Sequence, residues 1–205
     1  MLAFIPEEKA LMQKMNTPAK VQDFLNGLEF NFEEKGGMLK SPILTLRARR
    51  AHCMEGALLG AYILSLHEHK PLILHLQTAK GDFDHVIALF KENNLWGALS
   101  KTNHGVLRYR EPIYKNIREL IMSYFHEYIL DNGKKTLRRY SKPLNLNIFG
   151  NNWMLAEEDL WDIDDKLDKI KHYDIAPKEV FKKLRLADKI ERNLGKIVEY
   201  AIIKK

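Results

Sequence analysis

The segment from Cys53 to about Leu66 constrains the fold most strongly, because it reads as a helix that is apolar around most of its circumference. A helix without a wide polar face has to be covered on most sides by other elements. Small residues at positions 56, 60 and 61 allow neighbouring elements to approach closely. We therefore expect this helix at the centre of the molecule, with the rest of the chain packed around it.

The elements on either side of this helix are predicted from local patterns. Two short helices are expected before it, because two segments open with proline, which suits the first helical turn, and continue with apolar residues at helical spacing. After it, short apolar runs bounded by polar turn residues predict strands, of which the last two form a hairpin. The helices are Pro6–Met15 and Pro18–Leu28, and the strands are Pro71–Thr78, His85–Lys91 and Leu95–Lys101.

The remainder of the chain is expected to be mainly helical. Apolar spacing predicts helices at Ile113–Ile129, at Glu157–Ile170 and from Pro177 to about Ile203, the last in two pieces broken near Gly195. The sequence thus predicts an α+β fold in which a small antiparallel sheet packs on the central cysteine-bearing helix, with extra N- and C-terminal helices. We expect one domain over 1–205, made of N-terminal helices and a loop (1–48), a Cys/His core (49–103) and a mainly helical C-terminal part (104–205).

Composition excludes several classes of protein. The 205 residues are 45% apolar and 29% charged, as in ordinary globular domains. The net charge of +6 arises from basic clusters, but acidic runs interleave with them and no nucleic-acid motif is present, so we expect no nucleic-acid partner. A single cysteine cannot form an internal disulfide, and no apolar run approaches the roughly 18 residues that cross a bilayer. Because the start also lacks a signal-peptide pattern, we expect a cytoplasmic protein without a membrane span.

Two residues indicate chemistry. Cys53 is the only cysteine and stands at the start of the central helix, where unpaired backbone N–H groups and the helix dipole favour a thiolate. His85 stands at the start of a strand and could serve as its base. The pairing predicts a thiol nucleophile with a histidine partner.

The same segments resemble a known family. The order of a helix headed by cysteine, a strand, a strand that begins with histidine and a further strand resembles the transglutaminase-like branch of the papain-like cysteine proteinase superfamily, and in particular a prokaryotic group of transglutaminase-like proteins. The strings that carry the resemblance are RRAHCMEGALL at 49–59, DHVIALF at 84–90 and LWGALSKTN at 95–103, followed by LRYREP at 107–112, MSYFHEY at 122–128 and KTLR at 135–138. The resemblance implies that Cys53 is the nucleophile and His85 the general base.

The third catalytic residue departs from the family pattern. In that pattern an aspartate follows on the next strand, a few residues beyond a tryptophan; here Trp96 is present, but Ser100 stands at the aspartate position. A hairpin turn centred after residue 92 sets His85 against Ser100, and a turn centred one position later sets it against Thr102. Either hydroxyl can orient the imidazole but cannot stabilise its positive charge as a carboxylate does.

Other residues near this pair have alternative roles. Asn103 could orient the imidazole as the amide does in papain-type enzymes, and Asp82 could fold back toward it. Glu55 is expected to cap the central helix. His52 could contribute to an oxyanion hole, but we expect it to be a surface neighbour. An oxyanion hole would use the Cys53 backbone N–H and a second donor that no sequence feature identifies. No histidine spacing indicates a metal site, and we expect no cofactor.

The expected function follows from the candidate site, Cys53, His85, Ser100 and Asn103. We expect a cysteine-dependent hydrolase or acyltransferase, that is a peptidase, amidase or transglutaminase-like enzyme, which forms a covalent acyl-enzyme on a peptide, protein or small amide or ester. The alternative is a catalytically degenerate transglutaminase-like module that binds a peptide or small ligand, which the missing aspartate favours.

Overall fold

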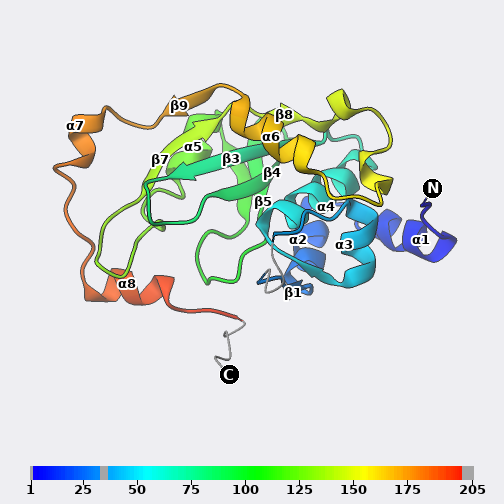
Figure 1. Cartoon of the computed structure of the whole chain (residues 1–205), viewed down its shortest axis with the longest axis horizontal. Coiled ribbons are helices and arrows are strands. Elements are labelled where there is room, and N and C mark those ends of the chain that lie inside the picture. The colour runs from blue at the N-terminus through cyan, green and yellow to red at the C-terminus, as the bar shows by residue number, and fades with distance from the viewer. Residues whose placement is uncertain (1, 33–36, 200–205) are drawn as a thin grey trace.

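A seven-stranded antiparallel sheet forms the middle of the molecule in the computed structural model, which describes residues 2–32 and 37–199 (Figure 1). The strand order is β6-β5-β4-β3-β7-β9, and β8 pairs with β3. The strands are β3 (Leu72–Thr78), β4 (His85–Glu92), β5 (Leu95–Leu99), β6 (Arg110–Tyr114), β7 (Leu137–Ser141), β8 (Leu144–Asn145) and β9 (His172–Asp174). The prediction of a mixed α+β chain with an antiparallel sheet is confirmed, although the sheet is larger than expected.

Helices of the N-terminal part gather at one end of the sheet (Figure 1). They are α1 (Pro6–Lys14), α2 (Pro18–Asn26), α3 (Pro42–Ala48) and α4 (Cys53–Ser65), and short strands β1 (Glu29–Phe30) and β2 (Arg50–Ala51) form a parallel pair beside them. The predicted helices at 6–15, 18–28 and 53–66 are confirmed within one or two residues at each end. Helix α3 was not predicted, because its Ser-Pro start reads equally well as a loop, although proline also suits the first helical position.

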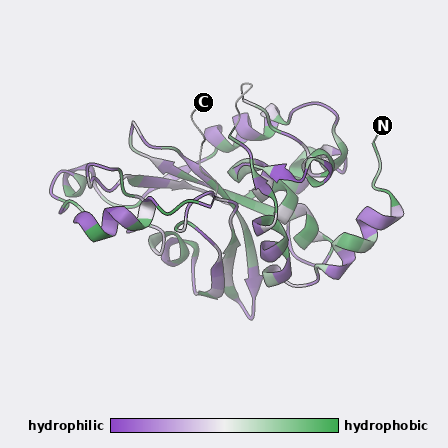
Figure 2. Ribbon diagram, turned by 90° about the horizontal axis from the view of Figure 1, so that it is seen from below, coloured by the Kyte–Doolittle hydropathy of each residue, from purple (hydrophilic) through white to green (hydrophobic). Residues whose placement is uncertain are grey.

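Each face of the sheet carries its own hydrophobic cluster. Alternate side chains of β4 point to opposite faces: Val86 and Ala88 pack in the cluster that contains α4, whereas Ile87 and Leu89 pack with α5 (Ile117–Met122). Figure 2 shows the hydrophobic stretches concentrated where the helices meet the sheet. Because both faces are covered, the run from residue 85 to 90 is buried throughout, which explains its nearly continuous apolar sequence.

Residues 113–129 do not form the long helix that their spacing predicts. Strand β6 ends at Tyr114, α5 covers only Ile117–Met122, and turns follow as far as Glu127. Strand β6 pairs with β5 and lies at the end of the strand order, a position that tolerates Pro112. The apolar residues at helical spacing, among them Leu120 and Tyr124, are still buried as the spacing suggested.

The C-terminal part is less helical than expected. It contributes strands β7, β8 and β9 to the sheet, and short 3-10 turns at Leu146–Phe149 and Trp153–Leu155. Helix α6 (Trp161–Lys169) begins later than the predicted Glu157. The last region has two short helices, α7 (Lys178–Phe181) and α8 (Lys189–Gly195); the break falls between them and α8 ends at Gly195, while positions 200–203 of the predicted helix lie outside the described residues.

The close approach of α4 to the end of β5 gives a first prediction. A Cβ added at Gly56 would lie 2.4 Å from Lys101 Cβ, whereas the nearest atoms to one at Gly60 would be the side-chain ends of two leucines, at 3.0 and 3.3 Å, and Ala88 Cβ at 3.9 Å. We expect Gly56→Ala to lower the free energy of unfolding by about 1–3 kcal/mol through overpacking. In Gly60→Ala, gained helix propensity of up to about 1 kcal/mol should offset the tighter packing. Urea unfolding of both variants tests this, and equal midpoints would contradict it.

Candidate functional site

The start of α4 is fixed by a reciprocal cap that places Cys53 in the first turn. His52 Nδ1 accepts the Met54 backbone N–H at 3.2 Å, and Glu55 Oε2 accepts the His52 backbone N–H at 3.0 Å. Glu55 is fully buried and also pairs with Lys40 Nζ at 2.9 Å. The predicted capping role of Glu55 is therefore confirmed, and the cap fixes the helical turn that carries the Cys53 side chain.

His85 is held by Ser100 on the neighbouring segment. The backbone register pairs Ala88 with Leu99, so the hairpin turn is centred between Asn93 and Asn94, and continuing that register sets His85 opposite Thr102. The imidazole nevertheless reaches diagonally: His85 Nε2 lies 2.8 Å from Ser100 Oγ. Diagonal neighbours on one sheet face lie within reach of a long side chain. Of the two hydroxyls left open by the sequence, the ring therefore meets Ser100.

The proton positions in this contact follow from a third atom. Ser100 Oγ lies 2.5 Å from the backbone carbonyl oxygen of Leu107, which can only accept. The single hydroxyl proton of Ser100 is thus donated to Leu107, and Ser100 Oγ accepts the Nε2–H of His85. In the neutral ring, Nδ1 is then without a proton and can act as a base.

Cys53 lies between two imidazoles. Burial raises the pKa of the Cys53 thiol, but hydrogen bonds and charge interactions with His52 and His85 outweigh burial and hold the pKa well below its ordinary value. For His52, burial lowers the pKa, while Cys53 and Glu55 raise it, with the balance at about 9. A protonated Nδ1 of His52 could not accept the Met54 N–H. The helix cap therefore favours the neutral ring of His52, whereas Cys53 and Glu55 favour the protonated ring. His52, expected to be a surface neighbour, is instead mostly buried, with 13% of its side chain exposed, and it lowers the pKa of the neighbouring thiol.

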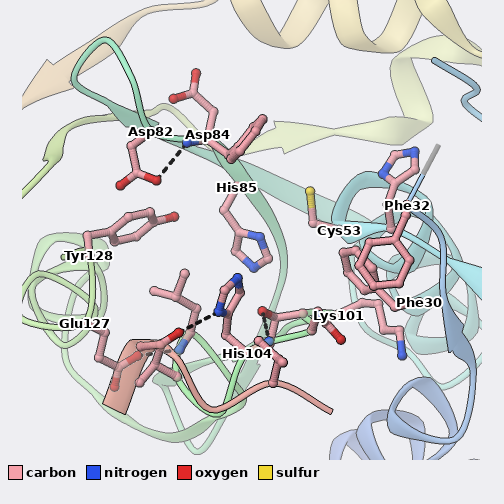
Figure 3. A pocket seen from close by; sticks show the side chains of 18 of the residues that line it. Phe30, Phe32, Cys53, Asp82, Asp84, His85, Lys101, His104, Glu127 and Tyr128 are labelled. Carbon is pink, nitrogen blue, oxygen red and sulfur yellow. Dashed lines mark hydrogen bonds between the residues drawn. The ribbon is translucent and has the colours of Figure 1, made fainter. Parts of the chain in front are cut away.

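A cavity of about 730 Å³ opens over these residues (Figure 3). Cys53 and His85 both line it, and Figure 3 shows the sulfur and the imidazole ring beside each other within it. Aromatic side chains from distant segments form much of the wall, and Phe83 at the loop before β4 is 90% exposed. The aromatic members are Phe30, Phe32, Phe83 and Tyr128. The cavity can therefore admit an apolar group next to the thiol.

Thr102, Asn103 and Asp82, the other candidates from the sequence, line the cavity, but Ser100 is the residue that hydrogen-bonds His85. Thr102 and Asn103 are buried, and the Asn103 carbonyl oxygen accepts the Glu199 N–H at 2.9 Å. Asp82 hydrogen-bonds Thr136 Oγ1 and the Phe83 N–H. Asp84 directly precedes His85, so its side chain is expected to point away from the face that His85 occupies. It pairs there with His75 of β3, at 3.0 Å.

Leu107, Glu127 and Lys101 are among the lining residues that were not anticipated from the sequence. Leu107 accepts the hydroxyl of Ser100, and Glu127 accepts the N–H of Leu107. Lys101 is 1% exposed, and its Nζ lies 2.5 Å from the Leu28 carbonyl oxygen. Burial lowers the pKa of Lys101 to about 8. A lysine two residues beyond β5 carries no sequence signal for burial. In the structure, the close approach of Gly56 in α4 to Lys101 Cβ helps to cover it.

Residues 195–199, at the end of α8 and just after it, lie at one side of the cavity. The Gly105 N–H donates to the Ile197 carbonyl oxygen at 2.8 Å, and His104 and Val198 form an antiparallel bridge. Arg108 and Glu199 make an ion pair across the same contact, at 3.1 Å. Gly195 and Val198 line the cavity, so this short segment forms part of its wall.

Comparisons with known proteins assign no family. No protein-family model matches the chain, and no curated protein is significantly similar to it. Among residues 2–32 and 37–199, no three His, Cys, Asp or Glu side chains are grouped so that they could hold a metal ion. Over the same ranges, no helix combines the length and apolar character needed to cross a membrane.

Proposed function

We propose that the protein is a cysteine-dependent hydrolase or acyltransferase that forms a covalent acyl-enzyme on Cys53, with His85 as the general base and acid. The observation that carries the proposal is the convergence of the two side chains in one cavity, with the Nε2–H of His85 committed to Ser100. The helix-first arrangement of Cys53 and the strand position of His85 also support a transglutaminase-like fold for residues 49–103.

The proposed acyl transfer uses the side chains of Cys53 and His85 and the backbone N–H of Cys53. His85 Nδ1 takes the proton of Cys53 Sγ, and the thiolate attacks the carbonyl carbon of an amide or ester to form a C–S bond. The oxyanion accepts the Cys53 backbone N–H at the start of α4. The imidazolium then returns its proton to the leaving amine or alcohol as the C–N or C–O bond breaks. Water or an amine, deprotonated by the same ring, attacks the thioester and releases Cys53.

The proposal predicts acylation by an activated ester. The wild-type protein mixed with p-nitrophenyl acetate should release a rapid burst of one nitrophenolate per chain and gain the mass of one acetyl group on Cys53. Cys53→Ala should lose both signals. His85→Ala should slow the burst by on the order of a hundredfold, the smaller end of what a positioned base contributes. His126→Ala is the matched control, because His126 is exposed and outside the cavity lining.

A binding module is the second candidate, and one observation favours it. The imidazole contacts a hydroxyl where the family pattern has a carboxylate, so an imidazolium at His85 lacks direct compensation from that partner. If a non-catalytic module is correct, acetylation of Cys53 will be as slow as that of a free thiol and will not depend on His85. The cavity would then retain a peptide or apolar ligand without modifying it.

A further inference from the structure

Leu107 adopts a backbone conformation that a leucine rarely has. Its φ angle is +60°, in the left-handed region that residues with a branched or bulky side chain rarely occupy. Such a conformation persists only where surrounding contacts determine it. The Leu107 carbonyl oxygen is also the acceptor that orients the Ser100 hydroxyl, at 2.5 Å. The position of one unusual peptide therefore sets the orientation of Ser100.

Glu127 holds the backbone of Leu107 in place from its N–H side. Its Oε2 accepts the Leu107 backbone N–H at 2.6 Å, and its Oε1 pairs with Arg110 at 2.6 Å. Arg110 is in turn fixed, since its Nε donates to Ser123 Oγ at 2.8 Å and its guanidinium lies 4.0 Å over the ring of Tyr124. The Glu127 carboxylate is thus bonded on both oxygens and anchored to a buried part of the second hydrophobic cluster.

The contacts form one continuous chain from Glu127 to the ring of His85. The carboxylate fixes Leu107, the Leu107 carbonyl accepts from Ser100, and Ser100 accepts from His85 Nε2. We propose, on the basis of the function proposed above, that Glu127 is the positioning residue for His85, acting through the Leu107 backbone and Ser100. A carboxylate thus supports the imidazole through two intervening residues, where the family pattern has one in direct contact.

The effect of Glu127 is geometric and not a transfer of charge. Its negative charge is already paired with Arg110, and the peptide of Leu107 separates the carboxylate from Ser100. A glutamine at this position keeps an oxygen that can accept the Leu107 N–H, whereas an alanine removes it. The two substitutions therefore separate the hydrogen bond from the charge.

The test measures alkylation of Cys53 by iodoacetamide at about pH 6, where an ordinary thiol is almost fully protonated. Glu127→Ala should slow alkylation by about tenfold or more, because small displacements of a catalytic group have effects of this size. Glu127→Gln should stay within about threefold of the wild type, as expected when the supporting hydrogen bond is retained. Nitrogen NMR shifts of the His85 ring should show protonated Nε2 in the wild type and mixed tautomers in Glu127→Ala.

Glu191 provides the matched control. Like Glu127, it accepts a backbone N–H, from Asp188 at 2.8 Å, and pairs with an arginine, Arg185 at 2.7 Å. Its side chain is 30% exposed against 29% for Glu127. Glu191→Ala should leave the alkylation rate and the tautomer of His85 unchanged.

A double-mutant cycle separates positioning from general destabilisation. If Glu127 acts through Ser100, Glu127→Ala should slow alkylation by less than about twofold in a Ser100→Ala background, because residues in one network are not additive. Additive effects, or a wild-type rate in Glu127→Ala with unchanged tautomers, would overturn the inference. Failure of the proposed function is recognised separately, since the wild type itself would then alkylate as slowly as an ordinary thiol.

Discussion

Cys53 is expected to react rapidly with iodoacetamide below neutral pH, and His85→Ala is expected to slow that reaction by on the order of a hundredfold at about pH 6. The thiolate is the reacting species. Burial of Cys53 opposes it, but His52 and His85 hold the pKa of the thiol well below its ordinary value. The rate should therefore rise with pH only through this lowered pKa and then level off. Removing an imidazole should move the plateau toward the pH of an ordinary thiol.

The contribution of His52 is separated by a substitution that retains the helix cap. Asparagine caps helices well, so His52→Asn removes the imidazole while leaving an acceptor for the Met54 N–H. We expect this variant to raise the pH of the plateau less than His85→Ala does. His126→Ala should leave the profile unchanged. A wild-type profile with the pH dependence of a free thiol would rule out the activated pair.

The central helix and the hairpin were predictable because their patterns are local. The segment after Cys53 is apolar all round over α4, and the strands at 85 and 95 are short apolar runs that flank a turn at Asn93 and Asn94. Residues 113–129 were misassigned, because burial of Leu120 and Tyr124 in α5 and the turn after it satisfies the same spacing that a long helix requires. Pairing of β6 with β5 decided the outcome, and that contact is not encoded in the local pattern.

The candidate site was predictable only in part for a similar reason. The sequence paired Cys53 with His85, since each stands at the start of a recognisable element, and it left Ser100 as one of several candidates for the third residue. Glu127 could not be found, because it acts on the backbone of Leu107, and nothing in the identity of a leucine indicates a positive φ angle. Glycine at 107 would have marked the turn.

Ser100 itself gives the largest expected effect on stability. Its side chain is 1% exposed, and its backbone is fixed on both sides by Gln22, at 2.9 Å and 2.8 Å. Ser100→Asp introduces the residue of the family pattern, but an ionised carboxylate has no proton to donate to the Leu107 carbonyl oxygen. The His85 Nε2–H can still donate to this carboxylate, but the carbonyl oxygen of Leu107 repels it. We expect the free energy of unfolding to fall by about 3–5 kcal/mol at neutral pH, as for a buried charge that is incompletely compensated.

The pH dependence of that loss identifies its cause. Burial against a carbonyl oxygen should raise the folded-state pKa of the introduced carboxyl by more than the hydrogen bond from His85 lowers it. The folded state then binds a proton more tightly than the unfolded state. The deficit should therefore be small below the unfolded pKa of about 4 and grow as pH rises through the folded value. Urea unfolding at acidic and at neutral pH measures it. Ser100→Asn, which has the same shape without charge and can donate to Leu107, should show little of this pH dependence.

The same variant tests whether the departure from the family pattern is a defect. Since the acceptor for residue 100 is the Leu107 carbonyl, Ser100→Asp should not accelerate alkylation of Cys53, even where the protein remains folded. A serine fits because one hydroxyl both accepts from His85 and donates to Leu107. If Ser100→Asp were as stable as the wild type at neutral pH and reacted faster, the Leu107 carbonyl would not be fixed in place, and Ser100 would be a degenerate replacement for a catalytic carboxylate.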